Sequence, residues 1–165
     1  MGLLTDLLGD GNATSAATQL LHVRDEKASG TQGGTFTSGA WQTRTLNTVK
    51  TNEISGASLA TNQVTLPAGT YEVDGSTPCY NGQQHQARLY DVTAAAALLL
   101  GSSAHADAAN NVMNYSLIRG RFTLAVQSEV RLEHRCTSTL ATTGFGLATS
   151  FGTEVYADLM IRKVA

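Results

Sequence analysis

The sequence predicts an all-β sandwich, and three observations lead to this prediction. Charged residues make up only 15% of the 165-residue chain, against about 25% in typical soluble domains. Threonine, serine, glycine, asparagine and glutamine take their place, and threonine favours pleated strands over helices. Apolar and polar residues also alternate at period two in several segments, and turn residues separate these segments at intervals of roughly 8 to 12 residues, as in two-sheet sandwiches.

The expected strands are short and half-buried, as in antiparallel sheets with one solvated face. Residues 130–139 illustrate the pattern, because Leu132, His134 and Cys136 are expected to face inward while the charged residues between them face solvent. The chain closes on a strand over 153–164. The remaining expected strands cover residues 20–27, 41–49, 63–66, 71–73, 86–92, 94–100 and 116–126.

Residues 94–100 are the ambiguous element. Their alanines favour a helix, whereas their short length, their leucines and the flanking Thr93 and Gly101 allow a buried strand. We expect a strand here. The polar segments 102–111 and 141–152 are expected to be loops.

Residues 1–19 differ from the rest of the chain. Four leucines recur at the spacing of one or two amphipathic helical turns, and a glycine-rich stretch over 9–12 ends the pattern: Leu3, Leu4, Leu7 and Leu8. A helix this short is not stable alone in water, so it needs a partner surface. We expect residues 1–19 to form an anchoring arm; the alternative is a frayed terminus.

Charge and hydropathy exclude two classes of partner. The net charge is −2 and the basic residues are scattered along the chain, so no basic surface for nucleic acid or for an anionic membrane is predicted. The longest apolar run, residues 94–100, is far shorter than the roughly 20 residues that a membrane span needs. We expect neither nucleic-acid binding nor membrane insertion.

The order of motifs resembles the trimeric jelly rolls of the complement and tumour-necrosis-factor-like superfamily. The resemblance is carried by residues 45–48 with 51–52, and by 63–71, where a strand ends in Pro-Ala-Gly-x-Tyr. The resemblance extends in order over residues 20–165, and its specific part is the stretch from Pro67 to Tyr71. It implies a jelly-roll domain over 20–165 that forms a homotrimer.

The segments 22–31 and 33–36 also look like jelly-roll domains of tailed-bacteriophage virion proteins. This resemblance implies a non-enzymatic structural protein of the virion, made in the host cytoplasm. It would decorate the capsid or tail as a trimeric knob, docked by its arm to other virion proteins, although no long fibre or coiled coil precedes the domain. The alternative is a receptor-binding tail knob that recognises a host surface glycan or protein.

Two groups of residues are candidates for these contacts. The final strand is apolar on both sides, so Tyr156 and Met160 are expected to face away from the core and to form the trimer interface. In the two loops, polar and aromatic side chains are candidates for facing a receptor: His105, Asp107, Asn110, Asn111 and Phe145.

The sequence holds no P-loop, no Gly-x-Ser-x-Gly and no His-Glu-x-x-His motif, which predicts a protein that is not an enzyme and that uses no cofactor. The four histidines are dispersed, so no metal site is expected. Glu72 and Asp74 share one strand face and could mimic a glycosidase carboxylate pair. We expect instead that both carboxylates simply lie on a solvated face of the strand.

Five further residues are expected to have structural roles. His134 and Cys136 lie two apart on one strand and are expected to form a buried structural pair. Cys79 could form a disulfide with Cys136 or remain reduced, and the sequence leaves both states open. Trp41 and Phe122 are expected in the core.

Overall fold

The computed structural model describes residues 18–164, and within them the chain forms twelve β-strands and no helix. The predicted all-β sandwich is therefore confirmed. The expected anchoring residues Leu3, Leu4, Leu7 and Leu8 lie outside the described residues. In the part of the chain that the structure describes, no helix has the length and hydrophobicity needed to span a bilayer.

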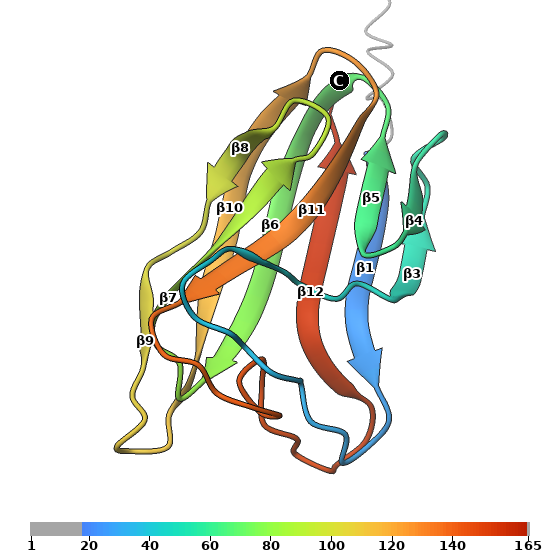
Figure 1. Ribbon diagram of the computed structural model, residues 1–165. Coiled ribbons are helices and arrows are strands. Elements are labelled where there is room, and N and C mark those ends of the chain that lie inside the picture. Colours follow the sequence, from blue (N-terminus) through green and yellow to red (C-terminus); the bar gives the residue numbers. More distant parts are fainter. Residues whose placement is uncertain (1–17, 165) are drawn as a thin grey trace, which may run out of the picture.

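The strands form two packed sheets (Figure 1), and the neighbouring strands in each sheet are antiparallel. In the first sheet, of five strands, β12 is central. Its strands are, in spatial order, β10 (Met113–Leu124), β6 (Gly69–Tyr80), β12 (Glu154–Lys163), β1 (Gln19–Lys27) and β3 (Thr48–Asn52).

The second sheet has seven strands, and two of them pair outside its main path. β2 (Gln42–Thr43) pairs with β11, and β9 (Ala104–Ala106) pairs with β7. The main path runs, in spatial order, through β4 (Ser58–Ala60), β5 (Gln63–Leu66), β11 (Ser128–Cys136), β7 (Gln83–Asp91) and β8 (Ala96–Leu100).

The main core lies between the sheets and follows the period-two pattern of the strands. Phe122 is 6% exposed and stacks on Tyr71 with ring centroids 5.4 Å apart, which confirms Phe122 as a core residue. The Tyr71 hydroxyl donates a hydrogen bond to the Pro67 carbonyl at 2.7 Å. This hydrogen bond closes the turn between β5 and β6, within the stretch that carries the family resemblance.

Residues 94–100 do contain a strand, β8, as expected. However, β8 is the edge strand of the second sheet, and Leu100 is 61% exposed. The prediction that this strand is buried was wrong, because an edge strand has a neighbour on one side only. The expected loop 102–111 also contains the short strand β9, which pairs with β7.

The expected strand over 41–49 is interrupted, since the chain changes sheets there. The Arg44 amide donates to the Leu132 carbonyl on β11, whereas the Asn47 amide donates to the Arg24 carbonyl on β1. A segment that crosses from one sheet to the other cannot stay in one ladder, so only β2 and β3 remain of the expected strand.

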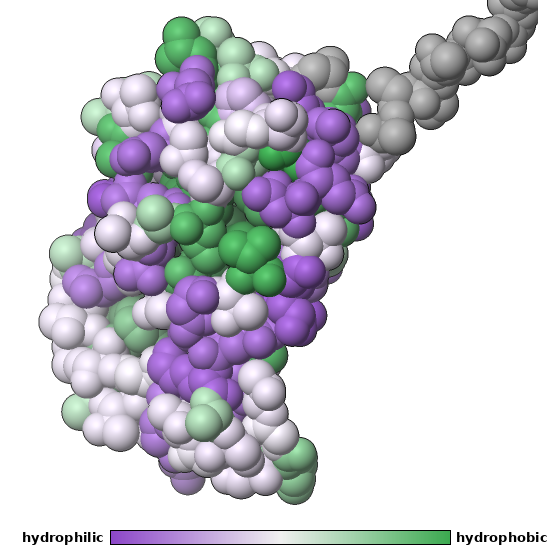
Figure 2. Space-filling model, turned by 90° about the vertical axis from the view of Figure 1, so that its right-hand side faces the viewer, coloured by the Kyte–Doolittle hydropathy of each residue, from purple (hydrophilic) through white to green (hydrophobic). Residues whose placement is uncertain are grey.

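Both sheets end with short strands at one side of the sandwich. Figure 2 views this side, where β3 and β4 lie in Figure 1, and shows an apolar area bordered by hydrophilic side chains. Val49 on β3 is 47% exposed. Short edge strands of five and three residues limit pairing with other chains at this side.

A second, smaller cluster closes one end of the sandwich. It consists of Phe36, Cys79, Ala106 and Cys136, with Phe145 packed against it. Both cysteines are buried and free, which resolves the pairing that the sequence left open in favour of thiols. Burial raises the pKa of Cys79 to about 12 and that of Cys136 to about 11, so both remain protonated.

Candidate functional site

Trp41 directly precedes β2, on the outer side of the second sheet, and is half-buried. The prediction that it is a core residue was therefore wrong. The side chain of this segment that enters the interior is that of Arg44, which is fully buried. Trp41 instead packs on Arg88 of β7, whose guanidinium carbon is 4.3 Å from the centroid of the indole ring.

Arg88 belongs to a ladder of aromatic and charged side chains that crosses β7 and β11. Its guanidinium carbon also lies 4.4 Å from the Tyr90 ring centroid, and its Nε donates to the Glu133 carboxylate at 2.5 Å. Arg131 binds the other oxygen of Glu133 at 2.6 Å. Because Glu133 is 2% exposed, this paired carboxylate holds Arg88, and through it Trp41, in one orientation.

Beside this ladder the outer surface of the second sheet is hollowed into a pocket of about 420 Å³. This volume falls in the range of about 300–1,000 Å³ that is usual for small-ligand sites. The lining comes from β7, from the end of β11 with the residue after it, from Trp41 and from the start of β9: Trp41, Gln84, His85, Gln86, Ser103, Ala104, Arg135, Cys136 and Thr137.

Alternation along β7 and β11 sets which of these side chains face outward. His85 and Cys136 are register partners with buried side chains, so Gln84, Gln86 and Arg135 point to the opposite, outer side of the sheet. Gln86 and Arg135 are register partners of each other. The sheet therefore presents one amide and one guanidinium side by side.

Two hydrogen bonds orient the glutamines. The Thr137 hydroxyl donates to Gln84 Oε1 at 2.8 Å, and Gln86 Nε2 donates to the Gly101 carbonyl at 2.8 Å. The other half of each amide, Gln84 Nε2 and Gln86 Oε1, has no protein partner within residues 18–164. The pocket thus offers a free donor and a free acceptor.

The outer face of the five-stranded sheet is different in character. Met160 lies on the central strand β12, in register with Asp74 of β6 and His22 of β1. Asp74 pairs with Arg119 at 3.3 Å, and Glu72 pairs with Arg121 at 2.5 Å. Glu72 and Asp74 are thus part of a solvated face, as expected, and each carboxylate has an arginine partner on β10.

A depression of about 360 Å³ lies on this same face. Tyr115 and Leu117 of β10 line it together with Met160. On the other side of Met160, His22 Nε2 contacts Asp158 Oδ1 at 2.7 Å, and Arg24 binds the second oxygen of Asp158 at 2.8 Å. The face therefore combines a partly apolar hollow with charges that are paired within the chain.

Tyr156 does not share this face, and its assignment to a trimer interface was wrong. Its side chain is 2% exposed, and its hydroxyl donates to the Thr31 carbonyl at 2.7 Å. The reason is a β-bulge: Asp25 pairs with Ala157 and Glu26 with Val155, so Tyr156 is an extra residue that turns inward. Gly146 makes room for the ring, since a Cβ there would lie 2.3 Å from a ring carbon.

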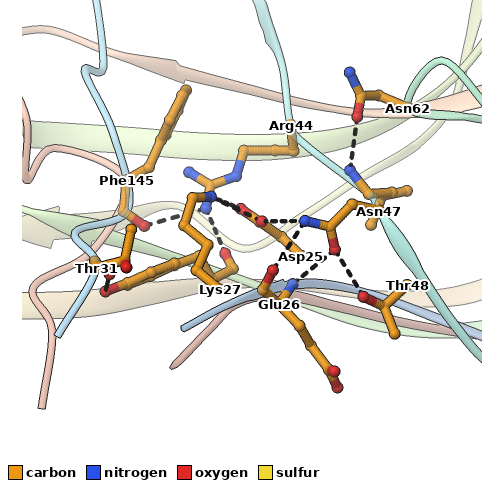
Figure 3. A network of polar contacts seen from close by, with 11 residues as sticks. Asp25, Glu26, Lys27, Thr31, Arg44, Asn47, Thr48, Asn62 and Phe145 are labelled. Carbon is orange, nitrogen blue, oxygen red and sulfur yellow. Dashed lines mark hydrogen bonds and ion pairs between the residues drawn. The ribbon is translucent and has the colours of Figure 1, made fainter. Parts of the chain in front are cut away.

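Arg44 organises a buried polar network that includes the Phe145 carbonyl (Figure 3). Its Nη2 donates to the carbonyls of Tyr156 and Phe145, the latter at 3.1 Å, and its Nη1 donates to the Pro78 carbonyl at 3.4 Å. Burial lowers the pKa of Arg44 to about 10, and nearby Asp25 opposes this shift. The guanidinium thus ties the segment around Phe145 to β6 and β12.

Phe145 is half-buried, and contacts with the rest of the fold hold it in place. Its ring packs on Phe36 with centroids 4.6 Å apart and lies 3.9 Å from the Arg44 guanidinium carbon. The same loop is held at its far end by Glu154, which accepts hydrogen bonds from the amides of Thr149 and Ser150. These bonds lower the pKa of Glu154. The 141–152 loop is an anchored part of the fold.

The four remaining loop candidates lie close together, on β9 and on the tip between β9 and β10. His105 and the two asparagines are exposed. Asp107 accepts hydrogen bonds from the Ala109 amide at 2.9 Å and from Asn110 at 2.6 Å, and these bonds lower its pKa. Asn111 accepts from Asn81 at 3.2 Å. Contact of this tip with a receptor stays a prediction.

His134 and Cys136 are both buried, as the sequence predicts, but the hydrogen-bond partner of His134 is His85. His85 Nδ1 and His134 Nε2 lie 2.9 Å apart, and the Cys136 thiol donates to the Ser138 carbonyl at 3.2 Å. Burial lowers the pKa of both imidazoles, that of His85 to about 4. Among residues 18–164, no three groups converge as metal ligands.

Comparison with known proteins places the fold. No protein-family model and no curated protein matches the sequence. Solved structures do match: three crystal structures of murine APRIL, at pH 5.0, 8.5 and 8.0, superpose with TM-scores of 0.57, 0.54 and 0.52. They share 10%, 10% and 12% sequence identity, and each match covers 88% of this chain and 98% of the APRIL chain.

This chain has a tumour-necrosis-factor-like jelly-roll fold. The resemblance that the sequence carried over residues 20–165 is thereby confirmed for the fold. At this low identity the likeness shows the architecture alone, so the role of the protein is argued from its own surfaces. Of the residues predicted for contacts, Met160 faces outward on the central strand, Tyr156 is buried and Phe145 is half-buried. The pocket beside Trp41 was missed, although Trp41 is the single tryptophan of the chain.

Proposed function

We propose that this chain is a non-enzymatic structural protein of a tailed-bacteriophage virion, a homotrimeric jelly-roll knob that decorates the capsid or tail. Residues 1–19 would dock it to other virion proteins. The proposal is supported by the jelly-roll fold and by the resemblance of residues 22–36 to virion domains. It also agrees with the lack of recognisable catalytic motifs in the sequence.

The outer face of the five-stranded sheet carries the trimeric part of this proposal. Met160 is a flexible apolar side chain at the middle of the sheet, and such side chains adapt to a partner surface. The carboxylates of Glu72 and Asp74 are each paired with an arginine within the chain. Burial of paired charges costs less than burial of single ones, so this face can enter an interface.

Sedimentation velocity on the full chain tests the oligomeric state. We expect a single species of three chains at micromolar concentration. A stable monomer of 17.3 kDa would contradict the trimer.

Electron microscopy of phage particles that carry a tagged copy of the chain tests the location. We expect the tag at regular positions on the capsid or tail. Particles that lack the tag, with the protein recovered free from the lysate, would exclude a structural role in the virion.

A receptor-binding tail knob is the second candidate, and one observation favours it. The pocket beside Trp41 lies on the outer face of the second sheet, opposite the proposed trimer interface, so trimer formation would leave it accessible. A tag found only at the tail tip, together with loss of adsorption to cells when the chain is deleted, would distinguish this function from capsid decoration.

A further inference from the structure

The pocket beside Trp41 has the composition of a carbohydrate site. We infer that it binds a pyranose sugar, with the aromatic surface of Trp41 against the ring and with Gln84, Gln86 and Arg135 contacting the hydroxyl and carboxylate groups. This inference concerns the second sheet only, and it depends neither on the trimer nor on the particle.

The first step of the argument is the orientation of Trp41. A half-buried tryptophan at the edge of a pocket supplies a large apolar surface with few rotatable bonds. Here Arg88 packs on its ring and is itself held by the buried carboxylate of Glu133 and by Tyr90. The indole is thus held in place before a ligand arrives, which reduces the entropy cost of binding.

The second step is the set of free polar groups. Gln84 Nε2 is a donor and Gln86 Oε1 is an acceptor, and each lies in an amide whose other half is already bonded within the protein. Sugar hydroxyls both donate and accept hydrogen bonds. A pyranose can therefore satisfy both amides in one pose, whereas a purely apolar ligand would leave them without partners.

The third step is the charge of the pocket. Among the described residues that line it, Arg135 is the one permanent cation, and it forms no ion pair within residues 18–164, in contrast to Arg88 and Arg131. A guanidinium binds a carboxylate through two parallel hydrogen bonds. A single cation matches the one carboxylate of a hexuronic acid better than the several charges of a nucleotide. A neutral hexose would leave the guanidinium without an anionic partner, so the pocket favours a hexuronic acid over both.

The test uses the full chain and its single tryptophan as a built-in reporter. The probes are methyl hexopyranosides and methyl hexuronosides of the gluco, galacto and manno configurations, titrated while Trp41 emission is recorded. We expect a saturable change with at least one uronoside, with a Kd on the order of 1 mM for so small a ligand. The matching neutral sugar should bind about tenfold more weakly.

Two exposed-face variants locate the binding. Arg135→Ala should weaken uronoside binding about tenfold and leave the neutral sugar unchanged, and Gln86→Ala should weaken both. Gln127→Ala is the matched control, because Gln127 is an exposed glutamine in the turn between β10 and β11 and does not line the pocket. The melting temperature of each variant is measured in parallel.

Two results would overturn the inference. One is the lack of any saturable emission change with all six sugars, well above the expected Kd. The other is a change that persists undiminished in both Arg135→Ala and Gln86→Ala, since the sugar would then bind elsewhere. Neither result would affect the sedimentation or microscopy tests of the proposed function, so the two failures are distinguishable.

Discussion

The guanidinium of Arg44 lies 3.9 Å from the ring centroid of Phe145 and donates a hydrogen bond to the carbonyl of the same residue. Two residues 101 positions apart in the chain are thus joined through both side chain and backbone. The contact connects the crossing between the sheets to the loop that closes the smaller cluster.

This contact predicts a large loss of stability in Arg44→Met. The substitution keeps roughly the length of the side chain but removes the hydrogen bonds to three carbonyls and the cation near Asp25, so we expect a loss of about 3 kcal/mol in the free energy of unfolding. Urea denaturation measures it. Arg119→Met, at a residue with a 64% exposed side chain, is the control and should change stability by less than about 0.5 kcal/mol. Equal stability of both variants would show that the network gives no net stabilisation.

The position of Met160 predicts the outcome of a charge substitution on the trimer face. Met160→Glu places an unpaired carboxylate beside Asp74 and Asp158, and burial of an unpaired charge in an interface is costly. We expect the variant to sediment as a monomer. Leu100→Glu, on an exposed edge strand of the other sheet, should remain trimeric. If Met160→Glu keeps the wild-type sedimentation coefficient, the interface lies on another surface.

The pair of His85 and His134 predicts a pH dependence of stability. Burial lowers the pKa of His85 to about 4 and lowers that of His134 as well, whereas both would be near 6.5 in the unfolded chain. Well above pH 6.5 both histidines are neutral in the folded and in the unfolded chain, so their protonation does not reduce stability. As the pH falls from about 6.5 to about 4, the unfolded chain takes up protons that the folded chain does not, so stability is lost.

Denaturation curves at pH 7.5 and pH 4.5 test this prediction. His85→Gln removes one of the two groups, and its loss of stability between these pH values should be smaller than that of the wild type by roughly 1 to 3 kcal/mol. His105→Gln serves as the comparison, since His105 is exposed and is the smallest of the three causes that lower the pKa of His85, so it should change the pH dependence much less than His85→Gln does. Identical pH profiles for His85→Gln and the wild type would refute the role of the pair.

The anchoring arm remains a prediction, because residues 1–17 lie outside the described residues. Burial of each leucine of the arm against a larger assembly should contribute roughly 1.5 to 3 kcal/mol, and three arms would add avidity. Deletion of residues 1–12 should therefore leave a folded trimer that no longer attaches to particles, as measured by co-sedimentation. Attachment at normal occupancy would place docking on the jelly roll itself. Failure to fold would show that the leucines belong to the core.

Local patterns in the sequence were sufficient for most of the strands and for part of the core. Alternation over 116–126 placed Phe122 inside, and the Pro67 to Tyr71 stretch marked a turn that the structure closes with a hydrogen bond. These features depend on neighbours within a few residues, where side-chain direction follows from the period of the strand.

The tertiary structure alone decided the surfaces that carry the proposals. Tyr156 is buried because the bulge opposite Asp25 and Glu26 shifts the phase of β12 by one residue, and such a shift depends on the partner strand. Trp41 faces outward because Arg44, a residue that is rarely buried, takes the inner side where the chain changes sheets. The pocket joins Gln86 to Arg135, 49 positions apart, because β7 and β11 pair in one register. No local pattern contains that information, since it arises only when distant strands meet.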